Sequence, residues 1–216
     1  MVSHRFLPRS ATIHRRSAAA SIAGAIFCAF AASLSAAPRL ESCHVDGVRE
    51  PVRCGEVTVL EKAGGDRQLG LRVVVLPATQ PEPLPDPVVI LAGGPGQAAS
   101  DLAGPIRRSF DDVRRRRDIV MIDQRGTGGS NPLNCDLGDA ADLLRGGGTP
   151  IEALRRCRAE LENRADLSAY STDRAADDLE QVRLAFGWPQ VNLWGGSYGS
   201  RLALVYQDRY PDAVRT

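Results

Sequence analysis

The segment around Ser197 constrains the fold of this chain more than any other. Residues 191–194 are a short, mostly apolar stretch typical of a buried strand, and residues 199–210 have the composition of a helix. Between them Gly195 and Gly199 flank Ser197 in the pattern G-x-S-x-G. A turn this sharp needs residues without bulk on either side of the serine, and it lifts the hydroxyl above the end of the strand. We therefore expect a strand, a tight turn and a helix, with Ser197 exposed at the tip.

This geometry predicts a nucleophile. A helix that begins just after Ser197 points its first N–H groups and the positive end of its dipole at that site. The N–H of Tyr198 would then be one of the donors that stabilise an oxyanion. The alternative is a glycine-rich turn that contains a serine by chance.

The rest of the pattern predicts an α/β fold. Residues 88–91 and 119–122 are continuous apolar runs, as buried parallel strands are. Helical stretches are expected at 99–115, with a break near Gly104-Pro105, and at 173–186, with Thr172 as N-cap. Strands that alternate with helices predict a mostly parallel sheet with helices on both faces.

The residues from 38 to 76 have a different pattern from the alternating strands and helices that follow them. Residues 38–55 are expected to be irregular, and strands are expected at 57–60 and 71–76, joined by a hairpin turn at 64–66. Residues 131–172 are expected to form a loop and helical insertion, with a helix at 151–161.

A second motif, A-G-G-P-G at residues 92–96, follows the expected strand 88–91 directly. Glycines allow close approach of a backbone to a substrate, so Gly94 could supply the second oxyanion donor. The alternative is an ordinary Gly-Pro turn. A phosphate-binding loop is disfavoured because the chain has no G-x-x-x-x-G-K-[ST] pattern.

A third motif, D-Q-R-G-T-G-G-S at residues 123–130, follows the expected strand 119–122. Asp123 is a conceivable catalytic acid. The interpretation that we favour is that Asp123 and Arg125 fix the geometry of this loop by hydrogen bonds.

In this order the three motifs resemble the prolyl aminopeptidase and tripeptidyl aminopeptidase branch of the α/β-hydrolases, over residues 43–216. The resemblance implies Ser197 as nucleophile, Gly94 and Tyr198 as oxyanion donors, and release of residues from a free peptide N-terminus. Ala92 stands where most members carry histidine, which resembles the secreted tripeptidyl-type members. The resemblance does not make Asp123 a triad residue.

The other two triad residues are not found. In this fold the order is serine, acid, histidine, but the three histidines, His4, His14 and His44, all precede Ser197. Asp208 and Asp212 are the only acids after Ser197, and neither follows a later strand. We therefore expect a C-terminally truncated hydrolase domain that is inactive alone.

Two other functions stay open: an esterase or lipase-like hydrolase of the same fold, and an inactive truncated product. Substrates would be peptides or small esters. No metal or organic cofactor is indicated, and the formal net charge of +1 gives no reason to expect nucleic acid.

The N-terminus predicts export. Residues 1–37 combine a basic start with a small, apolar stretch, the layout of a signal peptide, and Arg15-Arg16 leaves a twin-arginine type open. Residues 38–216 would be the secreted or periplasmic domain, without a membrane anchor after cleavage. Its four cysteines are expected to form disulfides, with the local pairing Cys43–Cys54 and Cys135–Cys157.

Overall fold

The computed structural model describes residues 37–135 and 151–216. All but the last residue of the expected signal peptide lies outside these ranges. The described residues form a sheet of six strands in the order β1-β2-β3-β5-β4-β6. The strands are β1 (Glu41–Cys43), β2 (Val52–Leu60), β3 (Gln68–Leu76), β4 (Val88–Leu91), β5 (Ile119–Ile122) and β6 (Asn192–Gly195).

The sheet is mixed. The strands β1, β2, β3 and β5 pair antiparallel in succession, and the predicted hairpin is confirmed, with Leu60 opposite Gln68 across its end. The strand β4 lies parallel to both of its neighbours, β5 and β6. The predicted α/β fold class is confirmed, but the expectation of a mostly parallel sheet was wrong for the described strands, because only the β5-β4-β6 half that leads to Ser197 is parallel.

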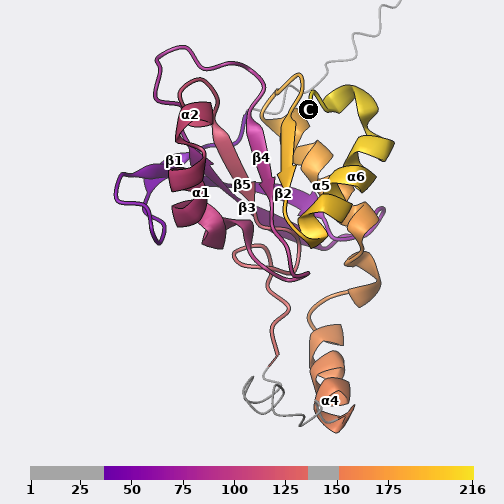
Figure 1. Cartoon of the computed structure of the whole chain (residues 1–216). Coiled ribbons are helices and arrows are strands. Elements are labelled where there is room, and N and C mark those ends of the chain that lie inside the picture. The colour runs from indigo at the N-terminus through magenta and orange to yellow at the C-terminus, as the bar shows by residue number, and fades with distance from the viewer. Residues whose placement is uncertain (1–36, 136–150) are drawn as a thin grey trace, which may run out of the picture. The chain divides into compact units, whose positions relative to one another are not determined.

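Helices cover both faces of the sheet (Figure 1). The 3-10 helix η1 (Ala99–Leu102) and the helices α1 (Ala103–Ser109) and α2 (Asp111–Arg114) connect β4 to β5. The helices α4 (Ile151–Glu162), η2 (Leu167–Ala169) and α5 (Thr172–Ala185) lie between β5 and β6, and α6 (Tyr198–Arg209) and η3 (Pro211–Ala213) follow β6. In the figure α1 and α2 lie on one side of the sheet and α5 and α6 on the other.

Alternate residues of the central strands build two separate cores. Val73, Val89 and Val120 face the side of α5 and α6, where they pack with Leu179, Leu202 and Tyr206. Their neighbours Val74, Ile90 and Met121 face the other side, where they pack with Ala103 and Ile106 of α1. Because successive strand residues point to opposite faces, a strand covered on both sides must be apolar throughout, which explains the runs at 88–91 and 119–122.

Three local expectations were wrong. Residues 38–55 are not irregular, because they contain β1 and the start of β2. Gly104 and Pro105 do not break a helix but lie in the first turn of α1. A proline is tolerated there because an N–H in the first turn has no partner inside the helix. The N-cap of α5 is Ser171, whose side chain accepts the N–H of Arg174, and not Thr172.

Both predicted disulfides are confirmed. Cys43 bonds Cys54 across the β1–β2 pair, and Cys135 bonds Cys157 of α4. In α4 only Leu161 is buried among the described residues of the helix. No helix within residues 37–135 and 151–216 is long and apolar enough to cross a bilayer.

The order of the strands marks a site. The chain leaves β4 for β5 on one side and later reaches β6 on the other side. In open α/β sheets such a switch point opens a crevice at the carboxyl ends of the strands, where ligands bind. The loop 92–96 follows β4, the loop 123–130 follows β5 and Ser197 follows β6, so all three motifs lie at this edge.

Candidate active site

Ser197 occupies a strained turn. Its backbone has φ 54° and ψ −121°, values that residues other than glycine rarely adopt, and its side chain is exposed. Ser197 is also the N-cap of α6, so Tyr198 is the first helical residue and its N–H has no partner inside the helix. The turn therefore presents a hydroxyl and a helix N-terminus to the same space.

The two glycines around Ser197 are required by close backbone contacts. A Cβ on Gly195 would lie 2.5 Å from the carbonyl carbon and oxygen of Gly199. A Cβ on Gly199 would lie 2.1 Å from the carbonyl oxygen of Leu91 at the end of β4. No side chain fits at either position, so the elbow can form only with glycine there.

The loop after β4 faces the serine. A Cβ on Gly93 would lie 3.2 Å from the Cβ of Ser197 and 3.8 Å from its Oγ. The next residue, Gly94, has φ +103°, and a Cβ there would come within 2.9 Å of the N atom of Gly96. The structure therefore places the loop that contains Gly94 beside Ser197, which precedes Tyr198 in the chain, and these are the three residues expected to form the catalytic centre and oxyanion hole.

Asp123 stabilises the loop instead of facing Ser197. Its side chain is fully buried, and its carboxylate accepts hydrogen bonds from the N–H of Ser100 (2.8 Å), the hydroxyl of Ser100 (3.0 Å) and the N–H of Gly129 (2.9 Å). The neighbouring Gln124 donates from Nε2 to the carbonyl oxygen of Ala92 at 3.4 Å. The turn after β5 thus holds the loop after β4 at both ends of the loop, at Ala92 and at Ser100.

Arg125 has a structural role as well. Its guanidinium forms a bidentate pair with Asp178 of α5, at 2.7 Å from Nε and 2.6 Å from Nη2. Nη1 donates to the carbonyl oxygens of Glu61 and Ala169. Burial raises the pKa of the Asp178 carboxyl, and the hydrogen bonds from Arg125 oppose that shift. The expected structural interpretation of Asp123 and Arg125 agrees with these contacts.

The described residues bring no histidine to the serine. His44 follows β1 at the edge of the sheet opposite β6, and it is exposed. Asp208 lies in α6 and Asp212 in η3, both exposed. Within residues 37–135 and 151–216, no group of three or more His, Cys, Asp or Glu side chains could hold a metal ion.

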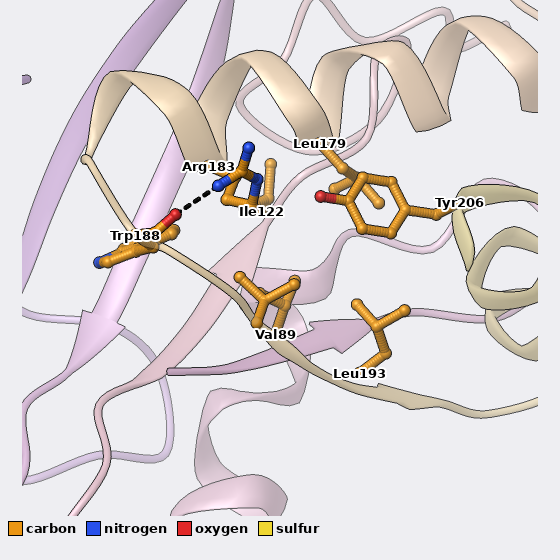
Figure 2. Close-up of a pocket in the computed structure, with 8 residues that line it drawn as sticks. Val89, Ile122, Leu179, Arg183, Trp188, Leu193 and Tyr206 are labelled. Atoms are coloured by element: carbon orange, nitrogen blue, oxygen red, sulfur yellow. Dashed lines mark hydrogen bonds between the residues drawn. The ribbon is translucent and has the colours of Figure 1, made fainter. Parts of the chain in front are cut away.

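Residues of α5 line several cavities, of which two border the sheet or the loops of the site. A cleft of about 170 Å3 opens beside the loop 92–96, between Tyr170 and Tyr198. The second cavity, between α5, α6 and the sheet, is lined by Val89, Leu179 and Tyr206 (Figure 2). Its volume is about 10 Å3, the space of one water molecule at most, so it is a packing defect and not a ligand site.

Sequence reasoning missed three residues of this region. Gly93 closely approaches Ser197, and its place in the 92–96 motif was the available signal. Ser100 and Asp178 are the partners of Asp123 and Arg125. No local pattern identifies them, because each lies on a different element from its partner.

Comparison with known proteins identifies the family of this chain. Residues 86–216, more than half of the chain, match the family described as the alpha/beta hydrolase fold. The chain belongs to this family.

Its relatives include several peptidases. The chain is 32% identical over 126 residues to a proline iminopeptidase of Xylella fastidiosa, covering 58% of this chain and 29% of that protein. It is 29% identical over 197 residues to a tripeptidyl aminopeptidase of Streptomyces lividans, covering 81% and 36%. The serine protease Hip1 of Mycobacterium tuberculosis is 28% identical over 181 residues, covering 75% and 34%. The chain thus spans about a third of the length of these relatives.

Among solved structures, the proline iminopeptidase of Mycobacterium smegmatis matches with a TM-score of 0.47 and 22% identity, over 74% of this chain and 41% of that one.

Proposed function

We propose that this chain carries the nucleophile and the oxyanion hole of an exported serine aminopeptidase. The observation that supports this most is the strained backbone of Ser197, at a helix N-terminus and facing Gly93 of the neighbouring loop. Strain of this kind costs about 1–3 kcal/mol and persists at functional sites. The relatives named proline iminopeptidase and tripeptidyl aminopeptidase favour a peptide substrate with a free N-terminus.

In the proposed reaction the Oγ of Ser197 attacks the carbonyl carbon of the scissile peptide bond. A general base takes the hydroxyl proton, and the N–H groups of Gly94 and Tyr198 stabilise the negative oxygen that forms. The C–N bond then breaks, the base returns the proton to the leaving amine, and an acyl ester remains on Ser197. Water hydrolyses this ester by the same proton route.

The base and its orienting acid would come from residues other than the described ones, since His44 is on the wrong edge of the sheet. Without a base a serine hydroxyl is a weak nucleophile. We therefore expect the 216 residues alone to be nearly inactive, and assays belong on the protein expressed from its complete reading frame.

The test compares three substrates: a tripeptide p-nitroanilide with a free N-terminus, its N-acetylated form, and a short-chain p-nitrophenyl ester. We expect cleavage of the free peptide, loss of that cleavage in Ser197→Ala, and poor cleavage of the acetylated form. Cleavage of the ester alone would favour an esterase, the second candidate on the same fold. A Ser197→Ala variant that retains full activity would refute the nucleophile.

Export is part of the proposal. It is supported by the basic and apolar character of residues 1–37 and by the two disulfides, which form in oxidising compartments. Fractionation of cells and N-terminal sequencing of the processed protein test it. We expect a product that starts near residue 38, outside the cytoplasm.

A further inference from the structure

The cleft of about 170 Å3 lies directly beside the proposed oxyanion hole. We call it the tyrosine cleft and define it by Pro95, Leu133, Tyr170, Ala175 and Tyr198, which line it together with Gly96, Ser171 and the turn 124–127. Pro95 belongs to the loop that faces Ser197, and Tyr198 follows Ser197 in the chain. A substrate held at Ser197 would therefore have a neighbouring group within reach of this cleft.

The hydroxyls of both tyrosines are already engaged with the protein. The Tyr170 hydroxyl donates to Oε1 of Glu61 (3.0 Å) and accepts from Nδ2 of Asn131 (2.7 Å). The Tyr198 hydroxyl is hydrogen-bonded to Oγ1 of Thr172 at 2.8 Å. Burial and the bond to Glu61 raise the pKa of Tyr170 to about 12, so its ring stays neutral. The tyrosines therefore offer their rings to an occupant and not their polar ends.

The one charged residue in the lining is also fully used. The side chain of Arg125 is 3% exposed. Its five N–H groups are directed at Asp178 and at the carbonyl oxygens of Leu60, Glu61 and Ala169. No carboxylate is among the described residues that line the cleft. The cleft thus has no free charge with which to bind an ammonium or a carboxylate.

From these contacts we infer that the tyrosine cleft binds an uncharged apolar or aromatic side chain of the peptide, next to the scissile bond. This inference rests on the proposed function. An aminopeptidase must bind both a side chain next to the scissile bond and the positive N-terminus of the substrate. Because the cleft has no free charge, the N-terminus has to be recognised elsewhere. A pocket that selects an apolar side chain by burial discriminates about 10–200-fold per added methylene at most.

The first experiment measures kcat/KM on the protein expressed from its complete reading frame. The substrates are unblocked peptides that carry Gly, Leu, Phe, Asp or Lys on either side of the scissile bond. We expect kcat/KM for the Leu and Phe peptides to exceed that for the Asp and Lys peptides by at least tenfold at one of these positions. Leu133→Trp, which fills the cleft, should lower the Phe and Leu values at least tenfold and leave the Gly value within twofold. The matched control is Leu154→Trp, at a 45% exposed position on α4, which should change nothing.

The second experiment does not need catalysis. The 216-residue chain with Ser197→Ala is titrated with N-acetylphenylalaninamide and with N-acetylaspartamide, and the methyl signals of Leu133 and Ala175 are followed by NMR. We expect the phenylalanine amide to shift these signals at millimolar concentration, the aspartate amide to have no effect, and Leu133→Trp to abolish the shift of the Ala175 signal.

The outcomes separate the two proposals. Cleavage with no side-chain preference, together with no binding of the phenylalanine amide, overturns the tyrosine cleft and leaves the peptidase standing. Binding of that amide by a protein that cleaves no peptide supports the cleft and overturns the peptidase. An equal fall of all substrates in Leu133→Trp would also count against the cleft.

Discussion

The carboxylate of Asp123 accepts two hydrogen bonds from Ser100, one from its backbone N–H at 2.8 Å and one from its hydroxyl at 3.0 Å. Asp123 directly follows β5, and Ser100 lies in η1, the 3-10 helix that follows the loop 92–96. The buried carboxylate therefore joins the end of one strand to the segment behind the proposed oxyanion loop.

We expect Asp123→Asn to lower the free energy of unfolding by about 1–3 kcal/mol, because an amide can accept with only one of its two polar atoms and one buried donor loses its partner. Urea unfolding followed by circular dichroism measures this. The control is Asp101→Asn, an exposed neighbour of Ser100, with an expected change below about 0.5 kcal/mol. Equal stability of the two variants would contradict the assigned role of Asp123.

The buried pair Arg125–Asp178 should matter far more than an exposed pair. The two side chains are 3% and 4% exposed, so Asp178→Asn leaves a buried guanidinium without its counter-charge and should cost about 3–5 kcal/mol. The control is Glu162→Gln, which breaks the exposed pair with Arg158 and should cost less than about 0.5 kcal/mol. Chemical unfolding of both variants gives the comparison, and a cost for Asp178→Asn no larger than that of the control would refute the argument.

Gly199→Ala tests the close packing of the elbow. The added Cβ would lie 2.1 Å from the carbonyl oxygen of Leu91. That oxygen belongs to the backbone of β4 and the Cβ is fixed to the backbone of α6, so β4 or α6 must shift. We expect a loss of about 1–3 kcal/mol or more in unfolding free energy. Gly65→Ala is the matched control, because its nearest atom would be 3.4 Å away. Thermal and urea unfolding measure both variants, and equal midpoints would show that the elbow is looser than described.

Glu50 should make stability depend on pH. Hydrogen bonds from Arg107 and Arg114 lower its pKa to about 2 from 4.5. A carboxyl with a depressed pKa in the folded state contributes stability above the unfolded pKa, and that contribution is lost as the pH falls from about 4.5 towards 2. Because the Glu50 side chain is 36% exposed, we expect a contribution of only about 0.5–1 kcal/mol.

The measurement is urea unfolding of the natural chain and Glu50→Gln at pH 6, 4 and 2.5. The difference between them should be largest at pH 6, smaller at pH 4 and smallest at pH 2.5. The control is Glu41→Gln, whose side chain is 70% exposed in its pair with Arg39 and which should show no such trend. A difference that grows on acidification would reverse the sign and exclude this explanation.

Local patterns predicted much of this molecule. The strands at 88–91 and 119–122 were located to the residue, because both faces of a central strand are covered and the whole run must be apolar. The hairpin between β2 and β3 and the glycine turn at Ser197 also followed from the sequence, since glycine permits backbone that other residues resist. The predicted helix ends were less accurate, as Ser171 and Thr172 show, because either side chain could cap a helix and only one accepts the N–H of Arg174.

Other features depend on contacts between distant elements. Thr172 bonds Tyr198 from 26 residues away, Ser100 meets Asp123 across 23, and Asp178 meets Arg125 across 53. By itself the sequence determined most of the strands, turns and helices, because those choices depend mainly on neighbours a few positions apart. The tertiary structure alone decided the strand order, the approach of Gly93 to Ser197 and the closed contacts of the tyrosine cleft. These features depend on which elements pack side by side, and the local preference of residues for helix, strand or turn does not determine that packing.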